Sequence, residues 1–199
     1  MVAADVLVVC TGNVCRSPYL ERRLQAELDD SWGAGQIVVA SAGTHALAHA
    51  PINQTGARLL RSYGADPGGF EARPLVAPML DGVGLVITMT REHRSQVTRM
   101  SPRLLPRTHA LRDLAQLAAA IDVSDVPAAD DTSARAWLGL VAPLLAARRG
   151  LAPPLAPQES GVVDPYGRGE AAYAQMAEQI EACLPAVLRV LRRPSTPGG

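Results

Sequence analysis

The stretch VLVVCTGNVCRSP at residues 6–18 carries the signals of a buried strand, a tight loop and a helix start. Its first four residues are apolar without polar alternation, which is typical of a parallel strand covered on both faces. Gly12 and Asn13 tolerate positive φ, so the loop can curl until several backbone N–H groups point at one spot. Ser17 and Pro18 predict a helix N-cap and first helical residue, which turns the positive end of the helix dipole toward the same spot. We therefore expect an anion-binding cradle after the first strand.

A cysteine and an arginine, Cys10 and Arg16, flank this loop six positions apart. Backbone N–H donors, the helix end and the arginine all favour the thiolate form of Cys10, to which the Ser17 hydroxyl can donate. The planar guanidinium of Arg16 offers a fork to two equatorial phosphoryl oxygens. The pattern predicts phosphoryl transfer through a covalent cysteine intermediate. The predicted phosphate-binding residues are Thr11, Gly12, Asn13, Val14, Cys15, Arg16 and Ser17.

Three motifs in this order resemble the low-molecular-weight protein tyrosine phosphatases. The first is Cys10–Pro18 directly after an N-terminal strand. The second, Ser41–Thr44, is similar to the family's second-strand exit, and the third, Asp164–Tyr166, is similar to its general-acid loop. The resemblance covers roughly residues 4–112 and 162–193. It implies a three-layer α/β/α fold of the Rossmann-like kind, with a four-stranded parallel sheet and the phosphate-binding loop after the first strand.

The resemblance also implies roles for residues outside the loop. Asp164 would be the general acid, and Tyr166, His45 and Leu47 would wall the substrate cleft. The implied function is hydrolysis of phosphotyrosine in proteins through a cysteinyl-phosphate, with no metal or organic cofactor and with inorganic phosphate as product and inhibitor. His45 and His49 have a spacing that could share a metal on a helical turn, but no acidic or thiol residue stands beside them in the sequence, which favours a polar loop.

Two other functions stay open on the sequence. Thiol-coupled arsenate reductases use a very similar loop, but they need two further cysteines as a disulfide relay, and residues 64–110 contain none. A catalytically weak phosphate-recognition module is supported by two departures from the family pattern. The chain has Phe70 where relatives commonly have a histidine that braces the loop asparagine, and Thr90 where they often have an aspartate. The sequence therefore leaves open how Asn13 is held.

Two assignments have alternatives within the chain. Cys15 is predicted to be a redox partner that protects Cys10 as a disulfide; the alternative is that Cys15 simply packs under the loop. Cys183 is expected to be inert core. The carboxylates that compete with Asp164 for the role of general acid are Asp125, Asp130, Asp131 and Glu159, which we interpret as a solvated acidic face.

The composition argues against several classes of protein. The 19 basic and 19 acidic residues balance, every basic residue is arginine, and no basic stripe indicates a nucleic-acid partner. No stretch approaches the ~20 apolar residues of a membrane span, and the N-terminus lacks the pattern of a signal peptide. The three cysteines make no disulfide framework and fit a reducing compartment. We expect a monomeric cytoplasmic protein with no membrane partner.

The length of 199 residues suits one well-buried domain. We expect one phosphatase domain built from residues 1–112 and 161–193. A helical insertion at 113–160 packs on the same domain, with a lid or partner-docking role as the alternative, and 194–199 is a disordered tail. The predicted strands are 6–10, 37–40, 85–89 and 108–111, and the predicted helices are 18–29, 53–63, 92–100, 111–121, 133–149 and 170–193.

Overall fold

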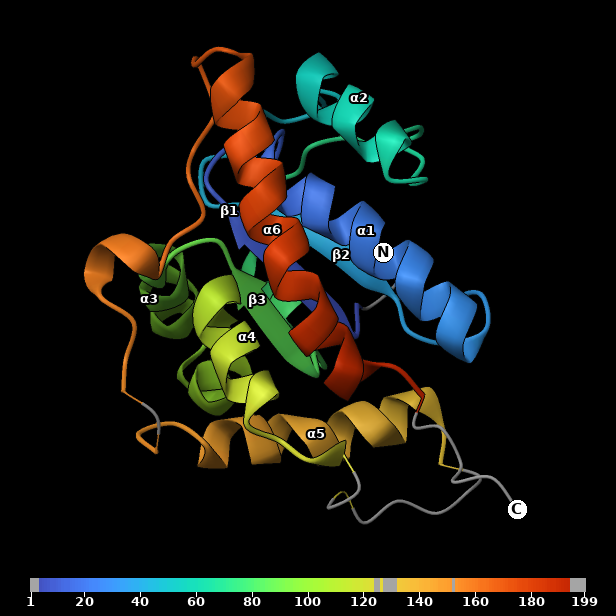
Figure 1. The fold of residues 1–199 in the computed structure, drawn as a ribbon, viewed down its shortest axis with the longest axis vertical. Helices are drawn as coiled ribbons and strands as arrows, with labels where there is room; N and C mark the ends of the chain where they lie inside the picture. Colours follow the sequence, from blue (N-terminus) through green and yellow to red (C-terminus); the bar gives the residue numbers. More distant parts are fainter. Residues whose placement is uncertain (1–3, 124–125, 127–131, 152, 194–199) are drawn as a thin grey trace.

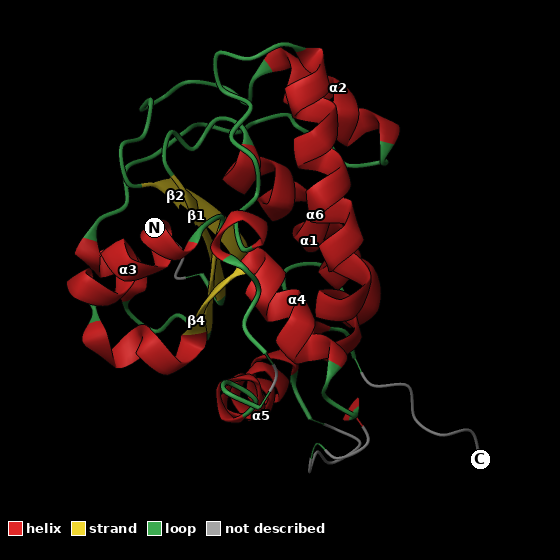
Figure 2. Cartoon of the chain, turned by 60° about the vertical axis from the view of Figure 1, so that its left-hand side comes forward, coloured by secondary structure: helices red, strands yellow, loops and turns green. Residues whose placement is uncertain are grey.

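Four parallel strands form the centre of the computed structural model, which describes residues 4–123, 126, 132–151 and 153–193. They are β1 (Val6–Cys10), β2 (Val39–Gly43), β3 (Leu85–Thr88) and β4 (Thr108–Ala110), in the order β2-β1-β3-β4. Figure 1 follows the chain through the fold, and Figure 2 shows the sheet enclosed between helices. The predicted three-layer fold with four parallel strands is confirmed.

The strand order makes the carboxyl end of β1 the place for a ligand. β1 lies between β2 and β3, so the strand order reverses direction at β1. Ligands of open α/β sheets bind outside the carboxyl ends of the strands at such a point. Cys10, the last residue of β1, pairs in register with Gly43 of β2. A side chain at position 43 would collide with the backbone carbonyl of Thr11, so the loop and the end of β2 approach each other only because residue 43 is a glycine.

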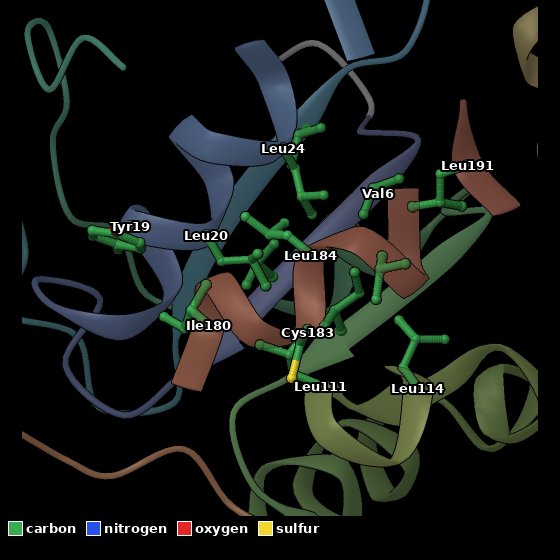
Figure 3. Packing of buried hydrophobic residues seen from close by; sticks show 14 of the residues in the cluster. Val6, Tyr19, Leu20, Leu24, Leu111, Leu114, Ile180, Cys183, Leu184 and Leu191 are labelled. Atoms are coloured by element: carbon green, nitrogen blue, oxygen red, sulfur yellow. The ribbon is translucent and has the colours of Figure 1, made fainter. Parts of the chain in front are cut away.

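Helices cover both faces of the sheet. Val6 and Val8 of β1 face the larger hydrophobic cluster, and Leu7 and Val9 face the smaller one, as the alternation of side chains along a strand requires. Figure 3 shows the larger cluster, where leucines of three helices meet over Val6. The helices are α1 (Arg16–Trp32), α2 (Gln54–Ser62), α3 (Arg91–Met100), α4 (Leu111–Ala119), α5 (Ala134–Ala147) and α6 (Glu170–Leu191), with 3₁₀ turns at Ala77–Leu80, Pro102–Arg107 and Pro157–Glu159.

The start of α1 differs from the prediction. Ser17 was expected to be the N-cap, but α1 begins at Arg16, the cap position is Cys15, and no side chain caps the helix. The Ser17 hydroxyl is instead turned toward Cys10. Backbone N–H groups in the first turn of a helix have no intrahelical partner, so without a capping side chain they remain available to an anion.

The second strand lies later in the chain than predicted. It was expected at 37–40, from its run of apolar residues, but it pairs with β1 from Val39 to Gly43. Pairing register decides its extent, because Val39 stands opposite Val6, the first residue of β1. The shift places Ser41 within the strand, with its side chain buried beside the loop.

The segment after α4 joins the main core through α5. Trp137 is 1% exposed and donates its indole N–H to the Val190 carbonyl of α6 at 2.9 Å. Leu138 lies so close to Gly84, just before β3, that a Cβ on that glycine would stand 2.7 Å from the leucine Cδ2. The side chains of α5 therefore extend the larger hydrophobic cluster at the end of the sheet opposite the carboxyl ends of the strands.

Both long C-terminal helices contain an internal proline. α5 continues through Pro143, and α6 continues through Pro185. Ser133 caps α5, accepting a hydrogen bond from the Ala136 N–H at 3.3 Å. Three carboxylates of the predicted solvated acidic face, Asp125, Asp130 and Asp131, and the predicted tail at 194–199 lie outside the described residues. In the part of the chain that the structure describes, no helix has the length and apolar character needed to cross a membrane.

Candidate active site

A pocket of about 140 Å³ opens at the carboxyl end of β1. The structure brings the predicted nucleophile, arginine, acid and wall residues to this one place, although they come from distant parts of the sequence. Glu159, a competing carboxylate, is not part of its lining. The lining residues are Cys10, Thr11, Gly12, Asn13, Val14, Cys15, Arg16, His45, Leu47, Asp164 and Tyr166.

Cys10 lies on the floor of the pocket with 2% of its surface exposed. Its Sγ is 2.9 Å from the Ser17 Oγ and accepts the Asn13 backbone N–H at 3.3 Å. Ser17 Oγ already accepts a hydrogen bond from Asn13 Nδ2 at 2.9 Å, so its own proton is free to point at the sulfur. Two hydrogen-bond donors, the Ser17 hydroxyl and the Asn13 N–H, are therefore aimed at the sulfur.

Asn13 holds the loop in its curled form. It has a φ of 55°, and it is completely buried. Its amide donates to Ser17 Oγ and, at 2.7 Å, to Ser41 Oγ, while its Oδ1 accepts the Arg73 backbone N–H at 2.9 Å. These three hydrogen bonds hold the asparagine in a chain that has Phe70 in place of the histidine expected from the family pattern.

A buried carboxyl group completes this network. Ser41 Oγ donates to Glu21 Oε2 at 2.5 Å, and the Glu21 residue is 6% exposed. Burial raises the pKa of Glu21, while the hydrogen bond from Ser41 opposes the rise. The donors thus run outward from the Asn13 amide, through Ser41 to Glu21 on one side and through Ser17 to Cys10 on the other.

His93 is a site residue that the sequence reasoning missed. Its Nε2 is 2.9 Å from Thr11 Oγ1 in the loop, and its Nδ1 is 3.0 Å from Thr90 Oγ1. Burial, with help from the positive charge of Arg16, lowers the pKa of His93 to about 4. The imidazole is therefore neutral at pH 7 and positions the loop without adding charge. A histidine in the first turn after the third strand was the signal available in the sequence.

Arg16 and Asp164 form an ion pair across the pocket. Arg16 Nη2 donates to Asp164 Oδ2 at 2.6 Å, and the Asp164 side chain is 46% exposed while that of Arg16 is 6% exposed. Asp164 Oδ1 accepts the Tyr166 backbone N–H at 3.2 Å, which folds the predicted acid loop into a turn. The loop is anchored from behind, because the Val162 N–H donates to the Met89 carbonyl at 2.9 Å.

The predicted wall residues stand at the rim. Leu47 is 43% exposed and Tyr166 is 58% exposed, and His45 completes this side of the lining. His49 is outside the lining, with its Nδ1 3.4 Å from Glu71 Oε2. Among the described residues, no group of three or more His, Cys, Asp or Glu side chains is arranged to hold a metal ion.

Comparison with known proteins agrees with this geometry. The family model described as "Low molecular weight phosphotyrosine protein phosphatase" matches residues 5–139. The chain belongs to this family. The family indicated by the cysteine loop, the second-strand exit and the acid loop is thereby confirmed.

Curated relatives match about half of the chain. The low molecular weight protein-tyrosine-phosphatase Etp of Escherichia coli is 38% identical over 104 residues, which are 52% of this chain and 66% of Etp. The match thus spans slightly less than two thirds of Etp. The probable low molecular weight protein-tyrosine-phosphatase AmsI of Erwinia amylovora is 32% identical over 104 residues, 52% of this chain and 68% of AmsI.

Solved structures share the fold over nearly the whole chain. The crystal structure of the E. amylovora tyrosine phosphatase AmsI gives a TM-score of 0.65 at 22% identity, covering 97% of this chain and 95% of that one. The YwlE arginine phosphatase from Geobacillus stearothermophilus gives 0.63 at 19% identity, covering 94% and 91%. At these identities the likeness concerns the fold alone.

Neutral His93 predicts a specific loss of stability in acid. Its pKa is about 4 in the folded protein and about 6.5 in the unfolded chain, so the unfolded chain binds more protons between these values. The free energy of unfolding keeps its full value, as far as His93 is concerned, above pH 6.5. It falls by on the order of 3 kcal/mol as the pH drops toward 4. Urea unfolding at several pH values should show a flatter acid limb for His93→Gln than for the parent protein. The exposed His45→Gln variant should keep the parent's slope; equal slopes in all three would contradict a buried neutral His93.

The raised pKa of Cys15 predicts that formation of a Cys10–Cys15 disulfide depends on pH. Cys15 is 3% exposed with Sγ 3.4 Å from the Tyr173 hydroxyl, and burial raises its pKa to about 11. Its thiolate fraction therefore grows about tenfold per pH unit below that value. After mild peroxide treatment, peptide mapping should find Cys10 in the disulfide rather than as sulfinic acid, increasingly so from pH 7 to 9. Sulfinylated Cys10 beside free Cys15 throughout this range would leave Cys15 as a packing residue only.

Proposed function

We propose that this chain hydrolyses phosphotyrosine in proteins through a cysteinyl-phosphate intermediate. The observation that carries the proposal is the convergence of Cys10, Arg16 and Asp164 on one pocket floored by the cysteine sulfur. The curated relatives are named as protein-tyrosine-phosphatases, and the three side chains suit the two chemical steps of such an enzyme.

In the first step, Cys10 attacks phosphorus and the aryl oxygen leaves. The N–H groups of the loop and the Arg16 fork stabilise the equatorial oxygens, whose charge is held through the transition state. Asp164 protonates the leaving oxygen. In the second step its carboxylate accepts a proton from the water that releases phosphate from Cys10.

Substrate binding would have to break the Arg16–Asp164 ion pair. A phosphate dianion in the cradle competes with the carboxylate for the same guanidinium, whose Nη2 is 2.6 Å from Asp164 Oδ2 in the free protein. In this proposal the substrate itself frees the acid.

The walls favour an aryl ester over a phosphorylated guanidino group. Val14, Leu47 and the Tyr166 ring supply apolar surface, and among the described residues the one carboxylate of the lining is Asp164, which the proposed mechanism uses as the acid. A cationic guanidino leaving group would find no carboxylate of its own there. Phosphoarginine, suggested by the names of structural neighbours that are arginine phosphatases, is therefore a comparison substrate.

The two alternative functions lack support from the site. An arsenate reductase needs a cysteine relay, whereas Cys15 contacts Tyr173 and Cys183 is a buried residue of α6 whose pKa burial raises. A binding module with a weakened loop was suggested by Phe70. The hydrogen bonds of Asn13 hold this asparagine without a histidine at position 70, so that departure gives no ground for lost turnover. The cytoplasmic location and the monomeric state stay predictions from the sequence.

Turnover of phosphotyrosine peptides with two site variants tests the proposal. Cys10→Ser deletes the nucleophile and Arg16→Lys removes the bidentate fork, so each should lower kcat/KM by at least about 10³-fold. Cys183→Ala and Arg58→Lys, both outside the pocket, serve as matched controls and should keep near-parental activity. Unchanged turnover in either site variant would reject the site. Faster hydrolysis of phosphoarginine than of phosphotyrosine would reject the substrate class.

Asp164→Asn should have two effects of opposite sign. Hydrolysis of phosphotyrosine should slow by roughly 10²–10⁴-fold, while an ester whose leaving group needs no proton should be little affected. Inorganic phosphate should inhibit the variant more tightly, because the carboxylate that pairs with Arg16 is gone. The control is Glu159→Gln, a nearby carboxylate outside the lining. Equal losses on good and poor leaving groups would mean that Asp164 is structural.

A further inference from the structure

A second pocket lies at the carboxyl end of β4 and has a cavity volume of about 260 Å³. It shares no lining residue with the pocket around Cys10. Three arginines enter its lining, Arg91 and Arg94 from α3 and Arg149 from just after α5, together with His109 and a single carboxylate, Asp113. The lining therefore carries an excess of positive charge.

Only one of the three guanidinium groups is neutralised by a carboxylate. Arg91 makes a two-pronged ion pair with Asp113, at 2.9 Å and 2.7 Å. Within the described ranges of the chain, neither Arg94 nor Arg149 has a carboxylate oxygen within 4 Å. His109 is neutral at pH 7, because burial lowers its pKa to about 3.

The two unpaired guanidinium groups converge on one atom. Arg94 Nε donates to the Thr108 carbonyl at 2.9 Å, and Arg149 Nη2 donates to the same oxygen at 2.5 Å. Like charges at such separations repel, and burial with the nearby charge of Arg94 lowers the pKa of Arg149 to about 10. Arg149 Nη1 is fixed on the Leu105 carbonyl at 2.6 Å, so the group cannot relieve the repulsion by swinging away without losing these bonds.

Hydrogen bonds from α3 and α4 hold the segment after α5 beside the pocket. Arg91 donates to the Leu155 carbonyl at 3.2 Å, and Gln116 donates to the Pro153 carbonyl at 3.0 Å, which ties the segment after α5 over the cavity. Its volume lies slightly below the ~300–1,000 Å³ of common small-molecule sites, which suits a compact anion.

We propose that this pocket is a second anion site, which binds a phosphate dianion, either free or as the end group of a small phosphate monoester. The fixed Arg94 and Arg149 charges attract the dianion, and its oxygens can take the N–H donors that these side chains do not already use on carbonyl groups or, for Arg149 Nη2, on the His109 ring. The site is independent of the phosphatase chemistry, because it contains none of the catalytic residues.

The binding test first disables the catalytic cradle, which also takes phosphate. In an Arg16→Ala background, calorimetric titration with inorganic phosphate at low ionic strength should show one remaining site. Glycerol 1-phosphate, titrated in parallel, distinguishes the two sources: tighter binding than phosphate points to a monoester, and weaker binding to the free ion. Succinate is the carboxylate comparison, and tighter binding of succinate than of either phosphate compound would overturn the phosphate assignment.

Variants then locate the remaining site. Adding Arg149→Met or Arg94→Gln should weaken phosphate binding by about tenfold or more, because each removes a charged donor. Arg148→Met, next to Arg149 but outside the lining, should leave binding unchanged. Circular dichroism establishes that each variant is folded, and Arg94→Gln provides the test if loss of the carbonyl contacts of Arg149 unfolds the protein. No phosphate binding in the Arg16→Ala protein, or binding that both pocket variants leave intact, would overturn the proposal. Because the readout is binding to an inactive protein, it does not depend on phosphotyrosine turnover.

Discussion

The buried left-handed backbone of Asn13 is the constraint on which the site depends. Residues other than glycine avoid positive φ, and this one stands at 55° with no exposed surface. Its side-chain amide donates hydrogen bonds to Ser17 and Ser41, and its oxygen accepts the Arg73 N–H. Aspartate could not donate the two bonds, and glycine would leave buried hydroxyl groups without their partner. The same curl aims the residue's own N–H at the Cys10 sulfur, so the shape of the loop also fixes a hydrogen bond to that sulfur.

The charge of the pocket is set by one ion pair, Arg16 with Asp164, and by a histidine that stays neutral. Arg16 faces Asp164 across the pocket, and the carboxylate neutralises the guanidinium in the free protein. His93 is close enough to hold Thr11, yet its low pKa keeps it uncharged at neutral pH. In the proposed reaction, a second permanent cation there would hold phosphate product more tightly and would weaken the competition between substrate and Asp164 for Arg16. A neutral imidazole positions the loop without that cost.

The fold and the centre of the site could be predicted because their signals are local. The run of apolar residues before Cys10, the Gly12–Asn13 loop and the spacing to Arg16 each depend on residues close together in the sequence. Ser17 was misassigned as a helix cap because the residue type is right for a cap, and only the position of the Cys10 sulfur decides where the hydroxyl turns. The extent of β2 was missed for a similar reason, since register with β1 sets it and apolar composition does not.

The parts that could not be predicted depend on contacts between distant segments. Nothing local marks the Arg73 backbone N–H as the brace of Asn13, and a single histidine at position 93 is more often an ordinary polar residue than a loop anchor. Arg149 is one arginine among 19 until the fold places it beside Arg94 on the Thr108 carbonyl.

The segment that returns from α5 links the two pockets through the covalent chain. Arg91 holds it at Leu155, beside the second pocket, and the Met89 carbonyl holds it again at Val162, just before the acid loop. Both anchoring residues flank Thr90, which in turn contacts His93 and, through it, Thr11 of the catalytic loop. The start of α3 is therefore the common support of the acid loop, the phosphate loop and the arginine pocket. A displacement of the returning segment at Leu155 has only a short length of chain in which to be absorbed before it reaches Asp164.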